Sequence, residues 1–348
     1  MSPRYLEISY HGSSHMERRL LFTFHTVALC LYLAGVVFYL NSPLRFDETE
    51  WPPQARAILQ RGVPKILYQE ENILRDRPYY GWDAHYGMWH PPAYQYSLAL
   101  AIKAFGYRTS TFRLAGVVFF VFSLILAMRI FTLLDHDRTK DSMLQFLPVS
   151  MCLMSPLLVE GSLYLDIDNT VLTSLILIFI YFFLRFSPKF SFKQLILCGL
   201  LFTACLWAKL TSPLLLPVAI VLYLLLNKEG LLKTLKVGFA VGAIGLGVFV
   251  LAYLVYCRSL NYPASFMFKT VYAGRIDGLL SLPVHGARET IRSLRYNFIW
   301  ASPMLSLLFF GTVTARVRNF IAIHKLEPVD FLITFALIGL VLYISCIG

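Results

Sequence analysis

Three acidic residues follow the first apolar stretch of the chain by only a few positions. Asp47, Glu48 and Glu50 lie just before Pro52, and proline is favoured in the first turn of a helix. A carboxylate that is half shielded from water has a raised pKa and can accept a proton from an attacking hydroxyl group. The same acids could instead complement the dipole of the helix that follows. The segment therefore indicates a general base, a substrate clamp or a helix start.

A second acidic pair and one isolated cation lie further along the chain. Asp166 and Asp168 occupy a short turn between two apolar runs, and Lys209 ends a later run. If the turn faces the same cavity as Asp47, the chain has a two-carboxylate centre, and Lys209 could hold a phosphate near the membrane surface. The alternatives are a solvated turn with Asp168 capping the next helix and a lysine that snorkels to water.

The segment 258–297 mixes basic and aromatic side chains. This mixture suits an anionic lipid head group with an apolar tail, although ordinary anchoring to anionic lipids would produce the same composition. The basic residues are Arg258, Lys269, Arg275, Arg288, Arg292 and Arg295, and the aromatic residues include Tyr262, Phe266, Phe268 and Tyr272.

Asp83, His85 and His90 carry donor atoms that a divalent metal could use. The two histidines are not spaced to lie side by side on a helix, and Trp82 and Trp89 adjoin them. Polar tips within an aromatic belt at the membrane surface explain the same residues. We therefore predict no metal ligand, and a divalent metal is the only cofactor that stays open.

The composition determines the elements that must position these groups. Of 348 residues, 57% are hydrophobic and 15% are charged, and the mean hydropathy is +0.62. A soluble fold could not bury so much apolar surface, so the chain is expected to be a polytopic membrane protein. The net charge of +11 is explained by basic cytoplasmic loops, and we predict no nucleic-acid partner.

The apolar runs predict about nine transmembrane helices, because each run is near spanning length and lipid offers the backbone no hydrogen-bond partner. We thus predict an all-α polytopic membrane protein. The runs are 20–40, 112–134, 143–164, 169–186, 194–210, 211–227, 237–257, 298–315 and 329–347.

The distribution of Lys and Arg predicts the orientation. If residues 1–19 are cytoplasmic and the spans alternate, the short basic loops all lie inside, as the positive-inside rule requires. Residues 20–348 then form one transmembrane domain with outer loops 41–111 and 258–297. Within the first outer loop, we expect interfacial juxtamembrane helices from Pro52 to Gly62 and over residues 91–106.

These motifs together resemble the GT-C glycosyltransferases, in particular the branch that contains protein O-mannosyltransferases and the lipid A aminoarabinose transferase. The resemblance covers roughly residues 20–275. It rests on Asp47-Glu48 followed by the segment 55–62, on Pro91-Pro92 through Phe105-Gly106 to Arg113, on the turn from Tyr164 to Asp168, and on Leu206-Trp207-Ala208-Lys209 through Pro217.

The resemblance implies an inverting enzyme that takes a sugar from a polyprenyl-phosphate carrier on the outer face of the membrane. The acceptor would be a hydroxyl group of a lipid, a glycan or a protein, and the membrane would be a bacterial inner membrane. The implied catalytic residues are Asp47 as base or clamp, Glu48 and Asp168. The implied substrate-binding residues are Lys209 and Arg275 for the departing phosphate, with Arg56, Asp166 and Tyr272.

The sequence departs from the family pattern in three places. His90 stands where the family usually has lysine before Pro91-Pro92, so one phosphate contact is lost or replaced. Tyr272 stands about where the aminoarabinose transferase has a histidine, which argues against a similar metal site. The chain also stops soon after its ninth predicted span, so we expect a compact or an incomplete version of the family.

Two other classes of protein would fit part of the sequence. A multi-span transporter or lipid flippase would place charge near the bilayer midplane, and here Glu160 and the interrupting Pro148 and Pro156 are compatible with that class. A lipid-anchored scaffold would use the outer loops to bind partners, but it leaves the two acidic sites unexplained.

Overall fold

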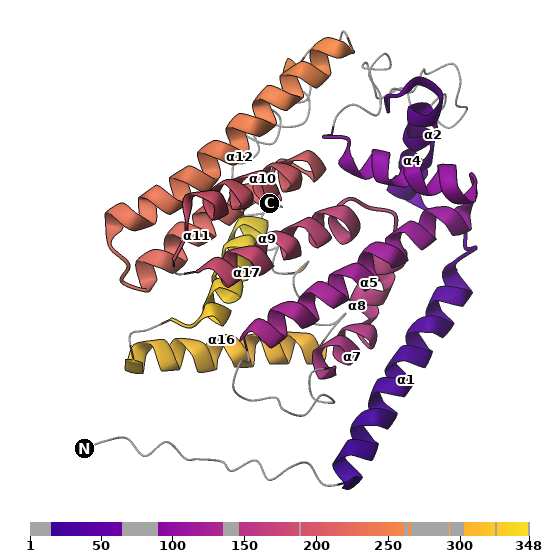
Figure 1. The fold of residues 1–348 in the computed structure, drawn as a ribbon. Coiled ribbons are helices and arrows are strands. Elements are labelled where there is room, and N and C mark those ends of the chain that lie inside the picture. Colours follow the sequence, from indigo (N-terminus) through magenta and orange to yellow (C-terminus); the bar gives the residue numbers. More distant parts are fainter. Residues whose placement is uncertain are drawn as a thin grey trace.

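The computed structural model describes residues 15–64, 90–134, 146–187, 189–260, 303–323 and 326–346, together with residues 264–265 and 292. Figure 1 shows an arrangement of helices, and the described residues contain no β-strand. This confirms the prediction of an all-α polytopic membrane protein.

Within the described part of the chain, three helices are long and apolar enough to cross a membrane. They are α1 (His15–Tyr39), α5 (Thr109–Leu134) and α12 (Leu231–Ser259). Shorter apolar helices lie between or beside them: α9 (Thr173–Phe186), α10 (Phe192–Ala208), α11 (Leu215–Leu226) and α17 (Pro328–Cys346). A further helix, α16 (Pro303–Ile323), is joined to α17 by ion pairs from Arg316 to Glu327 and Asp330.

The predicted span 143–164 was wrong as a single helix. The described part of this run forms two short helices, α7 (Leu147–Leu153) and α8 (Pro156–Leu163). The break lies at Ser155, whose ψ of 114° is extended rather than helical. The cause is Pro156, because proline disfavours the helical conformation of the preceding residue and has no N–H for the helix ladder.

Two other predicted spans begin with irregular turns. The run 169–186 starts as the π-helical turn η3 (Asp168–Leu172) before α9, and the run 211–227 starts as η4 (Ser212–Leu214) before α11. The turn η3 begins at Asp168, two residues after Asp166, and η4 closely follows Lys209, so the irregular backbone lies beside the candidate site residues.

The helices predicted within the segment 41–111 form where expected. The short helix η1 (Phe46–Glu50) leads into α2 (Trp51–Arg61), and α4 (Ala93–Phe105) follows the Pro-Pro pair. Gly62 ends α2 with a φ of 79°, and its N–H donates to the carbonyl of Ile58. Figure 1 shows α2 and α4 at one end of the bundle, which we call the site end.

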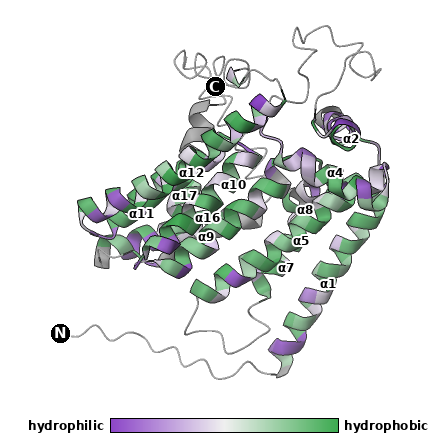
Figure 2. Ribbon diagram, turned by 45° about the horizontal axis from the view of Figure 1, so that its top comes forward, coloured by the Kyte–Doolittle hydropathy of each residue, from purple (hydrophilic) through white to green (hydrophobic). Residues whose placement is uncertain are grey.

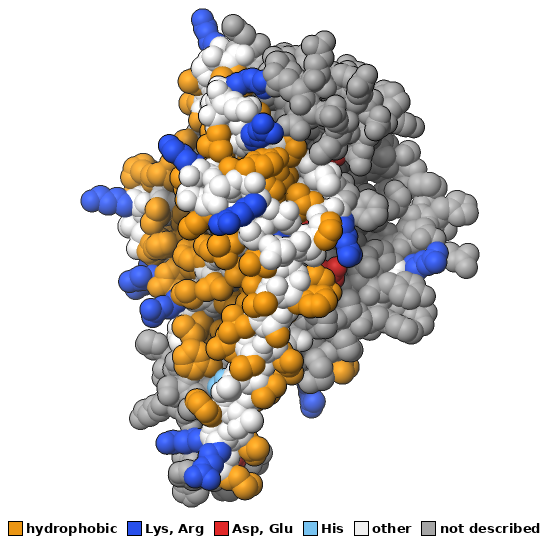
Figure 3. Space-filling view, turned by 90° about the vertical axis from the view of Figure 1, so that its right-hand side faces the viewer, with side chains coloured by type: hydrophobic (Ala, Val, Ile, Leu, Met, Phe, Trp, Pro, Cys, Tyr) orange, Lys and Arg blue, Asp and Glu red, His pale blue; other side chains and the backbone are white. Residues whose placement is uncertain are grey.

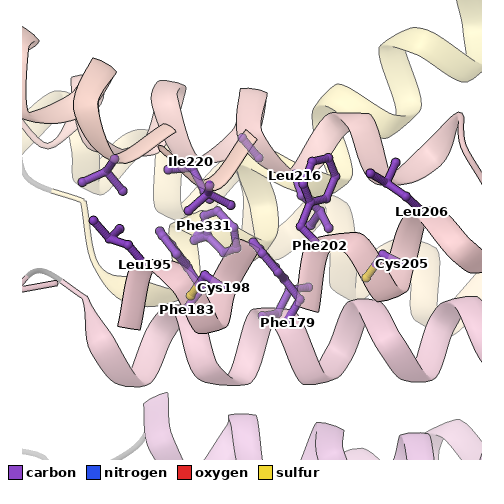
Figure 4. Packing of buried hydrophobic residues seen from close by; sticks show 14 of the residues in the cluster. Phe179, Phe183, Leu195, Cys198, Phe202, Cys205, Leu206, Leu216, Ile220 and Phe331 are labelled. Atoms are coloured by element: carbon purple, nitrogen blue, oxygen red, sulfur yellow. The ribbon is translucent and has the colours of Figure 1, made fainter. Parts of the chain in front are cut away.

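The largest apolar core joins α9, α10, α11, α12 and α17. Phe179, Phe183, Phe202 and Phe331 are completely buried there, and the rings of Phe183 and Phe331 have centroids 4.4 Å apart (Figure 4). Helices α10 and α12 approach closely because Gly245 of α12 has no side chain. A Cβ at this position would overlap the ring of Phe202 in α10. This core fixes the direction of α10 and hence the position of Lys209 at its end.

A second apolar cluster lies at the site end. It joins α2, α4, α5, η3 and α10 through Trp51, Tyr94, Phe112, Ile167 and Ala208, all of which are buried. Because these residues come from five separate elements, their packing holds the two acidic segments and the end of α10 at the same end of the bundle.

The surface is apolar between two charged ends. Figure 2 shows mostly hydrophobic helices, with hydrophilic residues concentrated on α2 and at the ends of the others. On the face shown in Figure 3, a broad hydrophobic area lies between groups of Lys and Arg. Exposed side chains of α1, such as Leu31, Val37 and Phe38, belong to such apolar surface, which suits a lipid environment.

Candidate active site

A buried ion pair between Glu48 and Arg113 lies at the site end. Nη1 of Arg113 is 2.8 Å from Oε1 of Glu48, and Nη2 donates to Oε2 at 3.2 Å, so the pair is bidentate. The side chains are only 1% (Glu48) and 6% (Arg113) exposed. The planar guanidinium fork matches the carboxylate in this geometry, which makes the contact strong and directional.

The same pair fixes the backbone of three chain segments. Arg113 also donates to the carbonyl groups of Ser42, Pro43 and Leu163. Glu48 accepts hydrogen bonds from the backbone N–H of Arg45 at 2.9 Å and from that of Leu165 at 3.0 Å. Thus η1, the segment after α1 and the turn after α8 are tied to the first turn of α5.

Lys209 and Asp168 form a second ion pair, and it is more exposed than the first. Nζ of Lys209 lies 2.5 Å from Oδ2 of Asp168, and the side chains are 20% (Lys209) and 42% (Asp168) exposed. Helix α10 ends at Ala208, and Lys209 has an extended φ of −156°, which breaks the helix there. Asp168 opens the π-helical turn η3 on the neighbouring segment.

Asp166 completes this group. Its Oδ1 accepts the backbone N–H of Ile167 at 2.7 Å. Burial and the nearby Asp168 carboxylate raise the pKa of Asp166, and the hydrogen bond from Ile167 and the charge of Lys209 only partly oppose that shift. Asp166 therefore keeps a proton at higher pH than an ordinary aspartate does. Its neighbour Asp168 is the carboxylate that pairs directly with Lys209.

Leu165 connects the two ion pairs. Its N–H is held by Glu48, and it directly precedes Asp166 in the chain. One hydrogen bond thereby joins the acidic segment after α1 to the acidic turn before η3. From the sequence, these two segments could only be placed on the same side of the membrane. The sequence did not predict Arg113 as the partner of Glu48. The signal that could have indicated it was an arginine near the start of an otherwise apolar helix.

Arg56 lies elsewhere on the site end. Its guanidinium carbon is 5.5 Å from the ring centroid of Tyr107, a cation–π contact on the exposed face of α2. The backbone of Asp47 lies in η1 beside Glu48, but its side chain is outside the described residues, as are Arg275 and Tyr272.

The described residues contain no group of three His, Cys, Asp or Glu side chains that could hold a metal ion. Asp83 and His85 lie outside the described residues, and the ring centroids of His90 and Trp51 are 6.2 Å apart.

The middle of the chain is similar to a known protein family. Residues 89–254 match the family model of the dolichyl-phosphate-mannose-protein mannosyltransferases. A comparison of the sequence with curated proteins finds no match.

The fold is similar to that of ArnT from Cupriavidus metallidurans. The structure of ArnT bound to undecaprenyl phosphate superposes with a TM-score of 0.61 at 15% identity, and the apo structure with 0.61 at 14%. The match covers 94% and 95% of this chain, respectively, but only 58% of ArnT. The predicted resemblance to the GT-C branch with protein O-mannosyltransferases and the lipid A aminoarabinose transferase is confirmed.

We expect Glu48→Gln to destabilise the protein, because Arg113 would keep a buried charge without its counter-ion. Breaking a buried ion pair in this way costs about 3 kcal/mol or more. Thermal unfolding of the purified protein in detergent measures the effect. Glu229→Gln is the matched control, since the Glu229–Lys233 pair is a more exposed i,i+4 contact, worth less than about 1 kcal/mol. Equal unfolding temperatures of the two variants would contradict the structural role of Glu48.

We expect Asp166→Asn to stabilise the protein at neutral pH. Because the pKa of Asp166 is raised on folding, the folded state is penalised once the carboxyl group ionises, and stability falls as pH rises above the usual value of 3.8. The difference in unfolding temperature between variant and parent should therefore shrink as the pH is lowered from 7 to below 4. Asp330→Asn, which removes a carboxylate paired with Arg316, should destabilise instead. A destabilised Asp166→Asn at pH 7 would refute the expected sign.

Proposed function

We propose that the chain is an inverting glycosyltransferase that moves a sugar from a polyprenyl-phosphate carrier to an acceptor hydroxyl group on the non-cytoplasmic side of the membrane. The single observation that carries the proposal is the meeting of Asp166, Asp168 and Lys209 beside the segment that Glu48 anchors. Carboxylates and a fixed cation in one place are what a hydroxyl acceptor and a phosphate leaving group require.

The reaction is a displacement at the anomeric carbon of the donor sugar. The acceptor oxygen attacks this carbon as its proton passes to a carboxylate, the bond from the carbon to the phosphate oxygen breaks, and the configuration inverts. The polyprenyl phosphate leaves with an additional negative charge. A cation already in position stabilises that charge better than mobile water does.

Asp47 is the proposed base. It adjoins Glu48 in η1, and Glu48 is engaged by Arg113 and by two backbone N–H groups. Glu48 therefore holds η1 in place, and Asp47 receives the proton of the acceptor hydroxyl group. Asp168 and Asp166 orient the acceptor next to Lys209.

Lys209 is the proposed phosphate ligand, with Arg275, Tyr272 and Arg56 as the other donor-binding residues. Lys209 is part-buried, and its partner Asp168 is half-exposed, so an incoming phosphate can compete for the ammonium group. The capture of undecaprenyl phosphate by ArnT, which has a similar fold, supports a donor of this class.

The proposed side of the membrane follows from the charge distribution. Several basic residues lie at helix ends that are remote from the site end. They are Arg18 at the start of α1, Arg185 at the end of α9, Lys193 at the start of α10 and Lys233 at the start of α12. By the positive-inside rule that end is cytoplasmic, and the site end faces the outside. A bacterial inner membrane is the proposed location.

We expect Asp47→Asn to lower the rate of sugar transfer by about 100-fold or more, as loss of a general base commonly does. The assay follows transfer of a radiolabelled sugar from polyprenyl phosphate to a mixture of membrane acceptors in detergent, at matched protein concentration. Glu229→Gln serves as the control for replacement of a carboxylate remote from the site end. Undiminished transfer by Asp47→Asn would remove its proposed role, and a parent protein without transferase activity that moves lipid across vesicles would favour a flippase.

We expect Lys209→Met to raise the KM for the donor by about 10- to 100-fold, because one charge-assisted contact to the phosphate is lost. Lys233→Met is the matched control, since Lys233 is exposed and pairs with Glu229, four residues earlier in the chain. Steady-state kinetics with varied donor concentration distinguishes the two variants. An unchanged KM and kcat in Lys209→Met would leave the lysine a purely structural partner of Asp168.

A further inference from the structure

A cavity of about 520 Å³ lies beside the Glu48–Arg113 pair, which forms part of its lining. It lies between the end of α1, the segment that leads to η1, the start of α5 and the helix α8. Lys209, Asp166 and Asp168 are not among its lining residues. The lining of the cavity thus differs from the group of Asp166, Asp168 and Lys209, although the Glu48–Arg113 pair forms part of it.

The charged groups that line this cavity balance one another. They are Arg45, Arg113, Glu48 and Glu160, two cations and two anions. Arg113 and Glu48 neutralise each other in their bidentate contact. Arg45 and Glu160 are exposed, and within the described part of the chain neither side chain forms an ion pair. One cation and one anion are thus left to face the same space.

Glu160 has no role in the proposed transfer reaction. It lies in the middle of α8, within an apolar run that the sequence identifies as membrane-embedded, where an ionisable side chain is costly and is retained for a function. Glu160 lines a cavity that also has apolar lining from Val159 and Leu163 and two aromatic residues, Tyr39 and Tyr164.

We propose that this cavity binds the zwitterionic head group of a phosphoethanolamine lipid. Arg45 binds the phosphate, and Glu160 accepts hydrogen bonds from the primary ammonium group, which the rings of Tyr39 and Tyr164 also favour. The acyl chains continue along Val159 and Leu163 toward the apolar surface of α1.

The charge balance separates this ligand from other membrane lipids. An anionic head group would gain the contact with Arg45 but would bring its negative charge close to Glu160. A polyprenyl phosphate would have the same disadvantage and would leave Glu160 without a partner. Only a ligand that carries both charges satisfies both side chains, and this argument does not depend on the proposed transferase activity.

Native mass spectrometry of the purified full chain in detergent tests the proposal. The protein is titrated with dioleoyl phosphatidylethanolamine and, in competition, with dioleoyl phosphatidylglycerol. We expect the parent to prefer the phosphatidylethanolamine by about tenfold, as one additional charge-assisted contact would give. Glu160→Gln should abolish the preference, and Arg45→Gln should weaken the binding of both lipids.

Glu229→Gln, a carboxylate change at the junction of α11 and α12, is the control and should keep the preference of the parent. Equal binding of the two lipids by the parent would overturn the proposal without any variant. A preference retained in Glu160→Gln would overturn it too. No sugar donor is present in the measurement, so a failure of Asp47→Asn to affect transfer would refute the proposed function and leave this inference intact.

Discussion

The buried contact between Glu48 and Arg113 is the interaction on which the arrangement of the site end depends. An ion pair this deeply buried persists only when both charges are fully hydrogen-bonded, and here both are. Its partners come from positions 42 to 165, so its geometry determines how three separate chain segments meet. The acidic residues of η1 and of the turn before η3 take their relative positions from this one contact.

The packing around the pair explains why the contact can form. The apolar cluster of Trp51, Tyr94, Phe112, Ile167 and Ala208 holds η3, α2 and α4 against α5 and α10. Removal of water from this region lowers the local dielectric and strengthens each charge interaction. The same dehydration raises the pKa of Asp166 and makes a lone charge there expensive.

Two polar regions of different character lie at the site end, and the Glu48–Arg113 pair is connected to both. Through the N–H of Leu165 it is joined to the acidic turn, where Lys209 and Asp168 are partly exposed and can exchange partners with a ligand. The pair also lines the cavity of Arg45 and Glu160, whose remaining charges are already neutralised. A transfer reaction and a bound lipid would thus depend on the same rigid element, and a change in Glu48 would disturb both.

The sequence by itself determined the class of fold, because hydrophobic composition and the length of apolar runs leave helices as the only spanning structure. It also located α2 and α4 from proline and glycine signals and named Asp168 and Lys209. Only the tertiary structure decided that Arg113 is the partner of Glu48 and that Lys209 reaches Asp168. These outcomes depend on which side chains from distant segments meet, and hydrophobic periodicity carries no information about that pairing.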